Sequence, residues 1–198
     1  MLDPTDPRLI RLLSYYRDAE LHGAGLLLHM TAMEDDPRSL GALTRHMADE
    51  SRHAALITRR IVDLGGAPQQ VRDGYQRRMA RAGGVPRTLL ELYAATRVAE
   101  ERAQARYTAH LSSPQVDPDT SALLRTINGD EVWHLAWVEA RLRDFAAAAG
   151  QGAVAAALRR FHEADAVVSR DLAAMEHEAF GFTFADAPLA PEPLFASA

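Results

Sequence analysis

The chain has 198 residues, a length typical of one domain. Hydrophobic residues make up 47% of it and charged residues 25%, and these proportions exclude global disorder and a collagen-like fibre. The formal net charge of -5 argues against nucleic-acid binding over the whole surface. The sequence contains neither Cys nor Lys. Disulfides, thiolate metal sites, a cysteine nucleophile and a Schiff-base lysine are therefore excluded.

The sequence has no feature of membrane insertion or export. No run of about 18 apolar residues occurs, so no segment is predicted to cross a membrane. Residues 1–7 are acidic and lack the apolar segment of a secretory signal. We therefore expect a cytoplasmic protein with no membrane partner.

Apolar residues recur along the chain with helical spacing, and no stretch shows the sustained alternation of a β-strand. The sequence therefore predicts an all-α fold. Pro37, Pro86 and Pro118 are placed at helix starts, where proline is well tolerated. We expect five helices, over about residues 7–33, 37–64, 86–111, 118–149 and 153–180. Residues 1–180 should form one helical bundle domain, and 181–198 a Pro/Ala-rich tail.

The lengths of the connections predict the topology. Short connections join the first helix to the second and the third to the fourth, so each pair should form an antiparallel hairpin. Residues 65–85 separate the two hairpins. A segment of that length can extend over about 65 Å, more than the roughly 42 Å of a long helix, so the second and third helices can run parallel. The prediction is a four-helix bundle with one long crossover, followed by a fifth, C-terminal helix.

Two similar motifs carry the candidate chemistry. They read Asp49-Glu50-Ser51-Arg52-His53 and Asp130-Glu131-Val132-Trp133-His134. In each motif the glutamate and the histidine are three residues apart, so both side chains project from one helix face. One such match would be a weak signal, whereas two matches, each preceded by an aspartate, indicate a paired site.

Two further glutamates complete the arrangement. Glu20 precedes Glu50 by about the same distance along the chain as Glu100 precedes Glu131. All four glutamates, the two of the motifs and these two, interrupt apolar stripes of the expected helices at mid-height, where core residues belong. Carboxylates that face one bundle core cannot stay ionised there without positive charge. The sequence therefore predicts a pair of divalent cations.

This pattern resembles the ferritin-like di-iron carboxylate superfamily, over about residues 7–149. The resemblance implies a ferritin-like bundle that holds two iron ions, with a manganese and iron pair as the alternative. It also implies terminal ligation by Glu20 and His53 at one metal and by Glu100 and His134 at the other, with Glu50 and Glu131 bridging. Asp49 and Asp130 resemble the aspartates that, in oxygenases of this superfamily, accept the N–H of a ligating histidine.

Several nearby side chains have simpler interpretations. His46 lies four residues before Glu50, and we favour a hydrogen-bonded core histidine over a third nitrogen ligand. Tyr16 and Trp137 lie one turn from predicted ligands, and for both we favour core packing over a role as an electron relay. Outside the ligand layer we expect His22, His29, His110, His162 and His177.

Three classes of di-iron chemistry fit the pattern. Rubrerythrins use a Cys-ligated iron, and many add a carboxylate near the third-helix ligand, whereas this chain has no Cys and carries Arg97 three residues before Glu100. Ferritins usually lack the second histidine. We therefore expect a non-haem di-iron oxidoreductase that uses O2 and an external electron donor to hydroxylate or otherwise oxidise an unidentified substrate. The alternative is a ferroxidase, an iron-storage protein or a peroxide-reducing protein.

The substrate could be RNA or a small molecule. In size and layout the chain is similar to the small superfamily member that hydroxylates isopentenyl-type adenosine in tRNA. Tyr75 in the crossover could stack a base, between arginines that could steer a phosphate backbone. These arginines are Arg72, Arg77, Arg78, Arg81 and Arg87. We favour a solvated crossover whose arginines pair with acids of the helices, and hence a small-molecule substrate over tRNA. The chain could also form a homodimer.

Overall fold

The computed structural model describes residues 7–114, 116–180, 189 and 194. That part of the chain contains six α-helices and no strand, which confirms the predicted all-α fold class. The helices are α1 (Pro7–Thr31), α2 (Pro37–Asp63), α3 (Tyr75–Gly83), α4 (Leu89–Leu111), α5 (Pro118–Ala149) and α6 (Gln151–Phe180). The predicted tail, 181–198, lies outside the described residues except for positions 189 and 194. None of the described helices is both long and apolar enough to cross a membrane.

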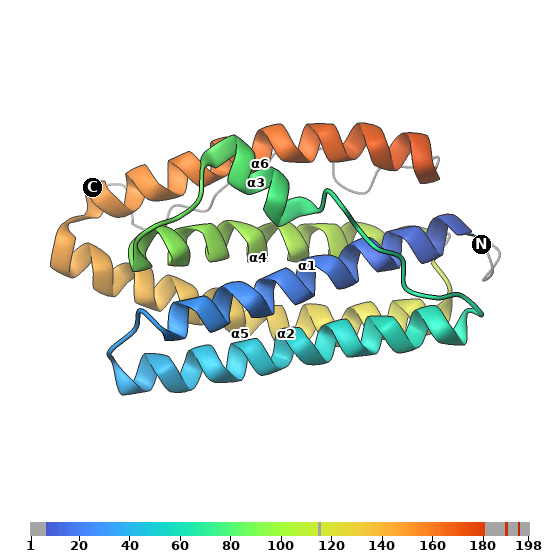
Figure 1. The fold of residues 1–198 in the computed structure, drawn as a ribbon, viewed down its shortest axis with the longest axis horizontal. Coiled ribbons are helices and arrows are strands. Elements are labelled where there is room, and N and C mark those ends of the chain that lie inside the picture. Colours follow the sequence, from blue (N-terminus) through green and yellow to red (C-terminus); the bar gives the residue numbers. More distant parts are fainter. Residues whose placement is uncertain (1–6, 115, 181–188, 190–193, 195–198) are drawn as a thin grey trace.

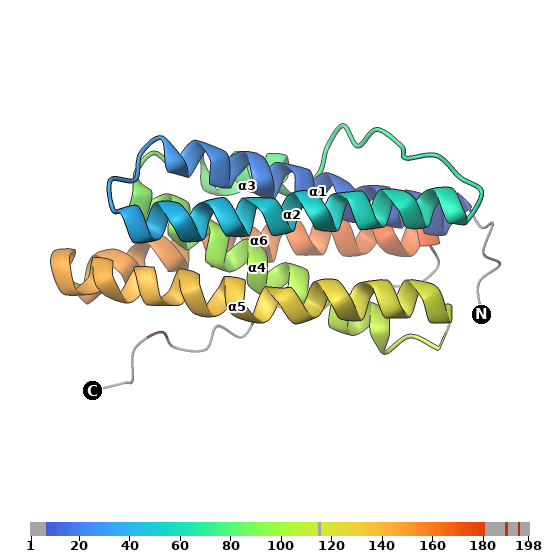
Figure 2. The same ribbon diagram turned by 90° about the horizontal axis from the view of Figure 1, so that it is seen from below.

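The long helices form two antiparallel hairpins, one of α1 and α2 and the other of α4 and α5 (Figure 1). Figure 2 shows the two hairpins lying one above the other. A crossover leads from the end of α2 to the start of α4 at the opposite end of the molecule, so α2 and α4 run in the same direction. Helix α6 follows α5 and packs against α3, α4 and α5.

Capping side chains define the starts of α2 and α5. Asp36 accepts a hydrogen bond from the Ser39 N–H at 2.9 Å, and Asp117 accepts one from the Thr120 N–H at 2.9 Å. A proline follows each aspartate, and this costs no hydrogen bond because the first N–H groups of a helix have no partner within it. Both starts agree with the prediction.

Two other helix starts differ from the prediction. Helix α4 begins at Leu89, later than expected, because the Thr88 side chain caps it and accepts from the Glu91 N–H at 3.2 Å. Helix α6 begins at Gln151, earlier than expected, because Gly150 alone makes the turn from α5. Gly150 has a φ of 90°, which glycine adopts without steric penalty.

Helix α3 was not predicted from the sequence, which indicated only a long crossover over residues 65–85. Its nine residues are too few for a stable isolated helix, and Gly74 offers no side chain to cap it. Tertiary packing stabilises it instead, because Tyr75 and Met79 are buried. The Tyr75 hydroxyl donates to Asp165 of α6 at 2.7 Å. Tyr75 is therefore not available to stack a base, and that part of the RNA hypothesis is wrong.

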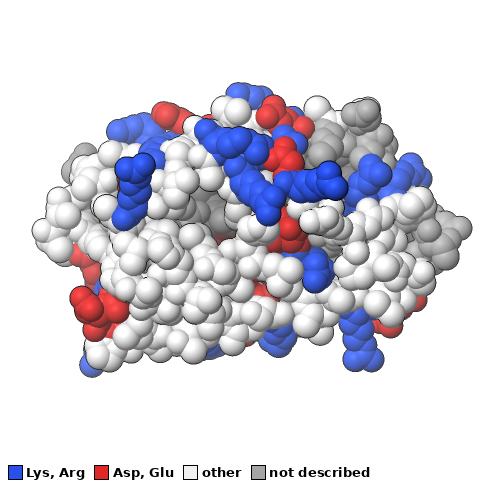
Figure 3. Space-filling model, viewed as in Figure 1, with Lys and Arg blue, Asp and Glu red and all other residues white. Residues whose placement is uncertain are grey.

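Arginines gather on the surface around α3 (Figure 3). Arg78 and Arg81 both pair with Asp73, with 3.0 Å between Arg78 Nη2 and a carboxylate oxygen. Arg77 donates to the backbone carbonyl of Arg72 at 2.9 Å. An acid of the crossover itself thus neutralises part of the local positive charge, whereas of the expected pairs with helix acids Arg78 makes one at 3.8 Å, with Asp171 of α6.

A buried carboxylate connects three helices. Asp165 of α6 is 1% exposed and accepts from Arg102 Nε of α4 at 2.9 Å and from the Tyr75 hydroxyl of α3. Arg102 is also buried, so water solvates neither charge. Because each charge depends on the other, removal of one leaves the second buried without a counterion.

We expect Asp165→Ala to lower the free energy of unfolding by about 3–5 kcal/mol, because it leaves the Arg102 guanidinium uncompensated in the core. Urea denaturation followed by circular dichroism measures the change. Asp171→Ala is the control, since Asp171 lies on the same helix with a side chain 62% exposed, and should change the stability by less than about 0.5 kcal/mol. Equal effects of the two variants would contradict a structural role for the Asp165 cluster.

Candidate metal centre

The six predicted ligands lie together in one layer across the two hairpins. Each is buried, with at most 7% of its surface exposed. Glu20 comes from α1, Glu50 and His53 from α2, Glu100 from α4, and Glu131 and His134 from α5. Four helices therefore contribute to a single buried cluster of acids and imidazoles. We call it the ligand layer.

One half of the ligand layer is formed by Glu20, Glu50, His53 and Glu131. One ligand atom of each lies within 4.8 Å of those of the others. His53 Nδ1 is 3.1 Å from Glu20 Oε2 and 3.5 Å from Glu131 Oε1. This group matches the residues that the resemblance implies for one metal, with both of the predicted bridging glutamates included.

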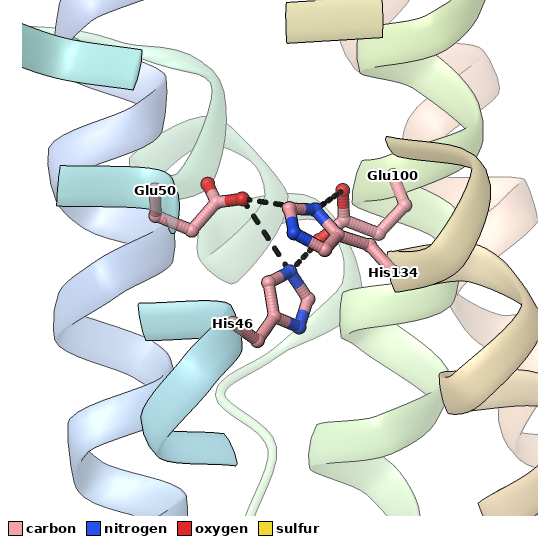
Figure 4. A group of neighbouring side chains, drawn as sticks. All are labelled: His46, Glu50, Glu100 and His134. Carbon is pink, nitrogen blue, oxygen red and sulfur yellow. Dashed lines mark ion pairs between the residues drawn. The ribbon is translucent and has the colours of Figure 1, made fainter. Parts of the chain in front are cut away.

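The other half is formed by His46, Glu50, Glu100 and His134 (Figure 4), again with one ligand atom of each within 4.8 Å of the others. Glu50 Oε1 is 3.4 Å from His134 Nδ1, so Glu50 belongs to both halves. Glu131 also reaches this half, because its Oε2 is 2.8 Å from His134 Nδ1. The two glutamates expected to bridge thus contact residues of both halves.

His46 lies among the predicted ligands. It is fully buried, and its contacts with two glutamates are compatible both with the hydrogen-bonded core histidine that we favoured and with a third nitrogen ligand. Its Nε2 lies 3.0 Å from Glu100 Oε1 and 3.4 Å from Glu50 Oε1, and its ring stacks on His134 with 3.7 Å between centroids. The sequence signal for this position was the spacing of four residues between His46 and Glu50, which places both side chains on the same face of α2. His46 is a third imidazole of the ligand layer.

Asp49 and Asp130 lie behind the two motif histidines, each on the opposite hairpin. His53 Nε2 is 3.2 Å from Asp130 Oδ2, and His134 Nε2 is 3.5 Å from Asp49 Oδ2. Arg52 donates to both aspartates, at 2.8 Å to Asp49 and 2.9 Å to Asp130. The aspartates therefore sit where they can hold the outer nitrogen of each histidine, while Nδ1 faces the glutamates.

Two residues at the ligand layer were not singled out from the sequence. The Tyr107 hydroxyl donates to Glu20. A Cβ on Gly23 would come within 2.7 Å of Glu50 Oε2, so a larger residue there would displace that carboxylate from its present position. Gly23 lies three residues after Glu20, on the same face of α1, and this spacing was the available signal.

The remaining singled-out side chains lie around the layer. Tyr16 packs edge-on against Tyr107, with 5.1 Å between centroids, and Trp137 packs edge-on against His46 at 6.2 Å. Their packing agrees with the core role that we favoured. His162 binds Glu101 at 2.7 Å, outside the layer. His22, His29, His110 and His177 also belong to neither ligand group.

The clustered acids shift one another's ionisation. Burial raises the pKa of Glu50 well above its usual value, and the charges of Glu20 and Glu100 raise it further. Burial also raises the pKa of Glu131, and the charges of Glu100 and Glu50 raise it further. Without a cation, both bridging candidates therefore favour the protonated form, because ionised neighbours would repel each other in the low-dielectric core.

The histidines respond to the same environment. Burial, aided by the charge of His46, lowers the pKa of His134 to about 4. Burial alone would raise the pKa of Glu100, but His46 overcomes this effect and lowers it to about 2. Burial would lower the pKa of His53, whereas its contact with Glu20 raises it. A neutral His134 beside an ionised Glu100 is the protonation state that a metal requires of its ligands.

The ligand layer fits divalent cations. Glu50 Oε1 is buried without a hydrogen bond to any described residue, which is costly unless another partner occupies it. A cavity of about 60 Å³ touches all four glutamates, namely Glu20, Glu50, Glu100 and Glu131. We call it the carboxylate cavity. It has room for several water molecules or for O2.

Comparisons with protein-family models, with curated proteins and with solved structures give no match for this chain. The resemblance to di-iron proteins therefore stays a prediction from the motif pattern. Function has to be argued from the side chains of the site, because a helical bundle by itself hosts many unrelated activities.

We expect the metal-free protein to lose stability as the pH rises from 6.5 to about 8.5. Glu50 and Glu131 stay protonated in the folded state after the unfolded chain has ionised, so rising pH favours unfolding. The raised pKa of His53 acts in the same direction, since its stabilising charge is lost as the pH rises through that value. His134, with a pKa of about 4, is neutral throughout this range. Melting temperatures of metal-free protein measure the effect.

The control is the double variant Glu50→Gln and Glu131→Gln, which cannot titrate at these positions and should show a flatter pH dependence. Saturating Mn²⁺ should flatten the wild-type profile as well, because the metal displaces the protons. Equal pH dependence in metal-free wild type and in the double variant would contradict the raised pKa values.

Proposed function

We propose that this chain is a ferritin-like dinuclear metalloprotein, a non-haem di-iron oxidoreductase that uses O2 to hydroxylate or otherwise oxidise an organic substrate. The observation that carries the proposal is the pair of buried four-residue groups that share Glu50. One ion would be held by Glu20, Glu50, His53 and Glu131, and the other by His46, Glu50, Glu100 and His134. The two hairpins and the long crossover support the ferritin-like arrangement.

The donor set favours iron or manganese. Four carboxylates and three imidazoles provide mostly hard oxygen ligands with some nitrogen, and the chain has no thiolate that would select zinc, copper or an iron–sulfur cluster. Iron is the proposed metal in both positions, with a manganese and iron pair as the alternative. The third imidazole, His46, makes the two halves unequal.

Once reduced by an external donor, the bound metal pair would supply electrons to O2 and direct oxidation of a substrate next to it. The residues of the chain position the site. Asp130 lies 3.2 Å from the outer nitrogen of His53, and Asp49 lies 3.5 Å from that of His134, so the two aspartates would orient both rings with Nδ1 directed toward the metal site. Arg52 keeps both aspartates ionised, and its contacts lower the pKa of each below its usual value despite partial burial.

Tyr107 controls the hydrogen bonding of Glu20. Burial, together with the charge of Glu20, raises the pKa of Tyr107 well above its usual value, so the hydroxyl stays protonated and remains a donor. Beside the glutamates, the carboxylate cavity is lined by tyrosines and alanines together with Gln76, Arg102 and Arg106, and the tyrosine and alanine side chains limit bulk water at the site. Such a site can keep a reactive oxidant from being quenched by solvent.

We expect purified protein, incubated anaerobically with ferrous iron and desalted, to retain about two iron ions per chain. Glu50→Ala should abolish retention of both ions, because Glu50 belongs to both groups. His53→Ala should weaken retention of chiefly one ion, because His53 belongs only to the group that contains Glu20. Elemental analysis and Mössbauer spectroscopy give the stoichiometry and the two iron environments. Retention of both ions by Glu50→Ala would refute the shared site.

The matched control for metal retention is Glu163→Ala, which removes an exposed glutamate of α6 remote from both groups. It should retain iron like the wild type. Because binding to the folded state alone stabilises it, iron should also raise the melting temperature of wild type and of Glu163→Ala, but not of Glu50→Ala.

We expect the iron-loaded protein to oxidise about two iron equivalents per chain with O2 and then stop until electrons are supplied. A ferroxidase of the storage type would continue to oxidise added iron and build a mineral core. A peroxide-reducing protein would react faster with H2O2 than with O2. Stopped-flow absorbance with each oxidant, together with size-exclusion chromatography of the product, distinguishes the three.

A further inference from the structure

A second, larger pocket lies beside the ligand layer. It has a volume of about 430 Å³ and is walled by α1, α3, α4 and the connection after α3, together with Phe161 of α6. We call it the α3 pocket. Figure 3 shows the molecular surface hollowed on this face, next to the arginines of α3. Its volume falls in the range of small-molecule sites.

The α3 pocket adjoins the carboxylate cavity. Three residues line both spaces, namely Tyr75, Gln76 and Ala99. These three residues therefore form part of the wall between the α3 pocket and the cavity that the four glutamates line. The arrangement places a site of substrate size directly next to a cavity of O2 size.

The chemistry of the wall selects an uncharged, mainly apolar molecule. Leu26, Met79 and Phe161 contribute apolar surface. None of the described residues that line the pocket is an acid or an arginine, and the arginines of α3 lie outside it. The groups that can titrate there are His22, His29 and Tyr75. Phosphate groups would thus find no guanidinium to bind within the pocket.

Gln76 supplies one specific polar contact. Its Nε2 donates to the Ala19 carbonyl oxygen at 2.9 Å, which fixes the orientation of the amide. Its Oε1 is buried and accepts no hydrogen bond from any described residue. Such an acceptor costs stability unless a donor reaches it. A ligand N–H or O–H at the boundary between pocket and cavity would satisfy it.

We propose that the α3 pocket is the substrate site of the proposed di-iron centre, and that it takes a small, mainly apolar organic molecule whose N–H or O–H donates to Gln76 Oε1. The donor end of the molecule then faces the carboxylate cavity. This inference rests on the proposed function for the reaction, but binding to the pocket can be measured without it.

Gly25 allows the pocket to be filled without disturbing the fold. It lines the α3 pocket within α1, and a Cβ added there meets no atom within 4 Å. Replacement of a helical glycine also favours the helix. Gly25→Phe should therefore fold while its ring occupies the pocket. Gly41 of α2 offers a matched control, because it is exposed, helical and equally open, and it lines none of the pockets described above.

Indole and benzofuran are the probes, because the two molecules have nearly the same shape and only indole carries an N–H. Isothermal titration calorimetry should give a Kd for indole about 3- to 10-fold lower than for benzofuran, as expected for one hydrogen bond. Gln76→Met should reduce that ratio to about one. Gly25→Phe should weaken both probes by at least about tenfold, whereas Gly41→Phe should bind both like the wild type.

Proton NMR of bound indole tests whether the probe lies close to the metal site. Bound indole should show broadened proton NMR signals when the protein is loaded with paramagnetic Mn²⁺, and sharp signals with Zn²⁺. Absence of indole binding to wild type, unchanged binding to Gly25→Phe, or absence of broadening in Mn²⁺-loaded protein would each overturn the proposal. If no metal binds but indole binding depends on Gly25 and Gln76, the di-iron function fails while the α3 pocket stands as a binding site.

Discussion

The mutual repulsion of four buried glutamates is the constraint on which the rest of the structure depends. Each comes from a different long helix, so their repulsion acts to separate the two hairpins. Apolar side chains above and below the ligand layer oppose it, among them Leu43, Ile57, Leu124 and Val138, all fully buried. Protons reduce the repulsion at Glu50 in the metal-free chain, and divalent cations would remove it. Packing and charge compensation therefore have to be satisfied in the same layer.

The features that could be predicted from sequence are those set by local spacing. Helical periodicity and the prolines at the starts, Pro37 and Pro118, indicated the long helices, because both signals arise within a few residues. The paired Glu-x-x-His motifs placed acid and imidazole on one helix face for the same reason. Glu20 and Glu100 followed from the phase of their apolar stripes, and the structure brings all of them into one cluster.

The features that could not be predicted depend on contacts between distant segments. Helix α3 forms because Tyr75 reaches Asp165, ninety residues further along the chain, and no local signal encodes that contact. The partner of His46 could not be read from its own helix, because Glu100 approaches it from α4 and so brings it into the ligand layer. Gly23 matters because Glu50 of the neighbouring helix needs its space.

The ligand layer and the α3 pocket draw on different parts of the chain. The predicted ligands all lie on α1, α2, α4 and α5, whereas Met79 and Phe161 bring α3 and α6 into the pocket wall. Substitutions in α3 can therefore alter which molecules enter without touching a residue of the ligand layer. Duplicated copies of this chain could in this way diverge in the compound they accept while the same reaction centre is inherited unchanged.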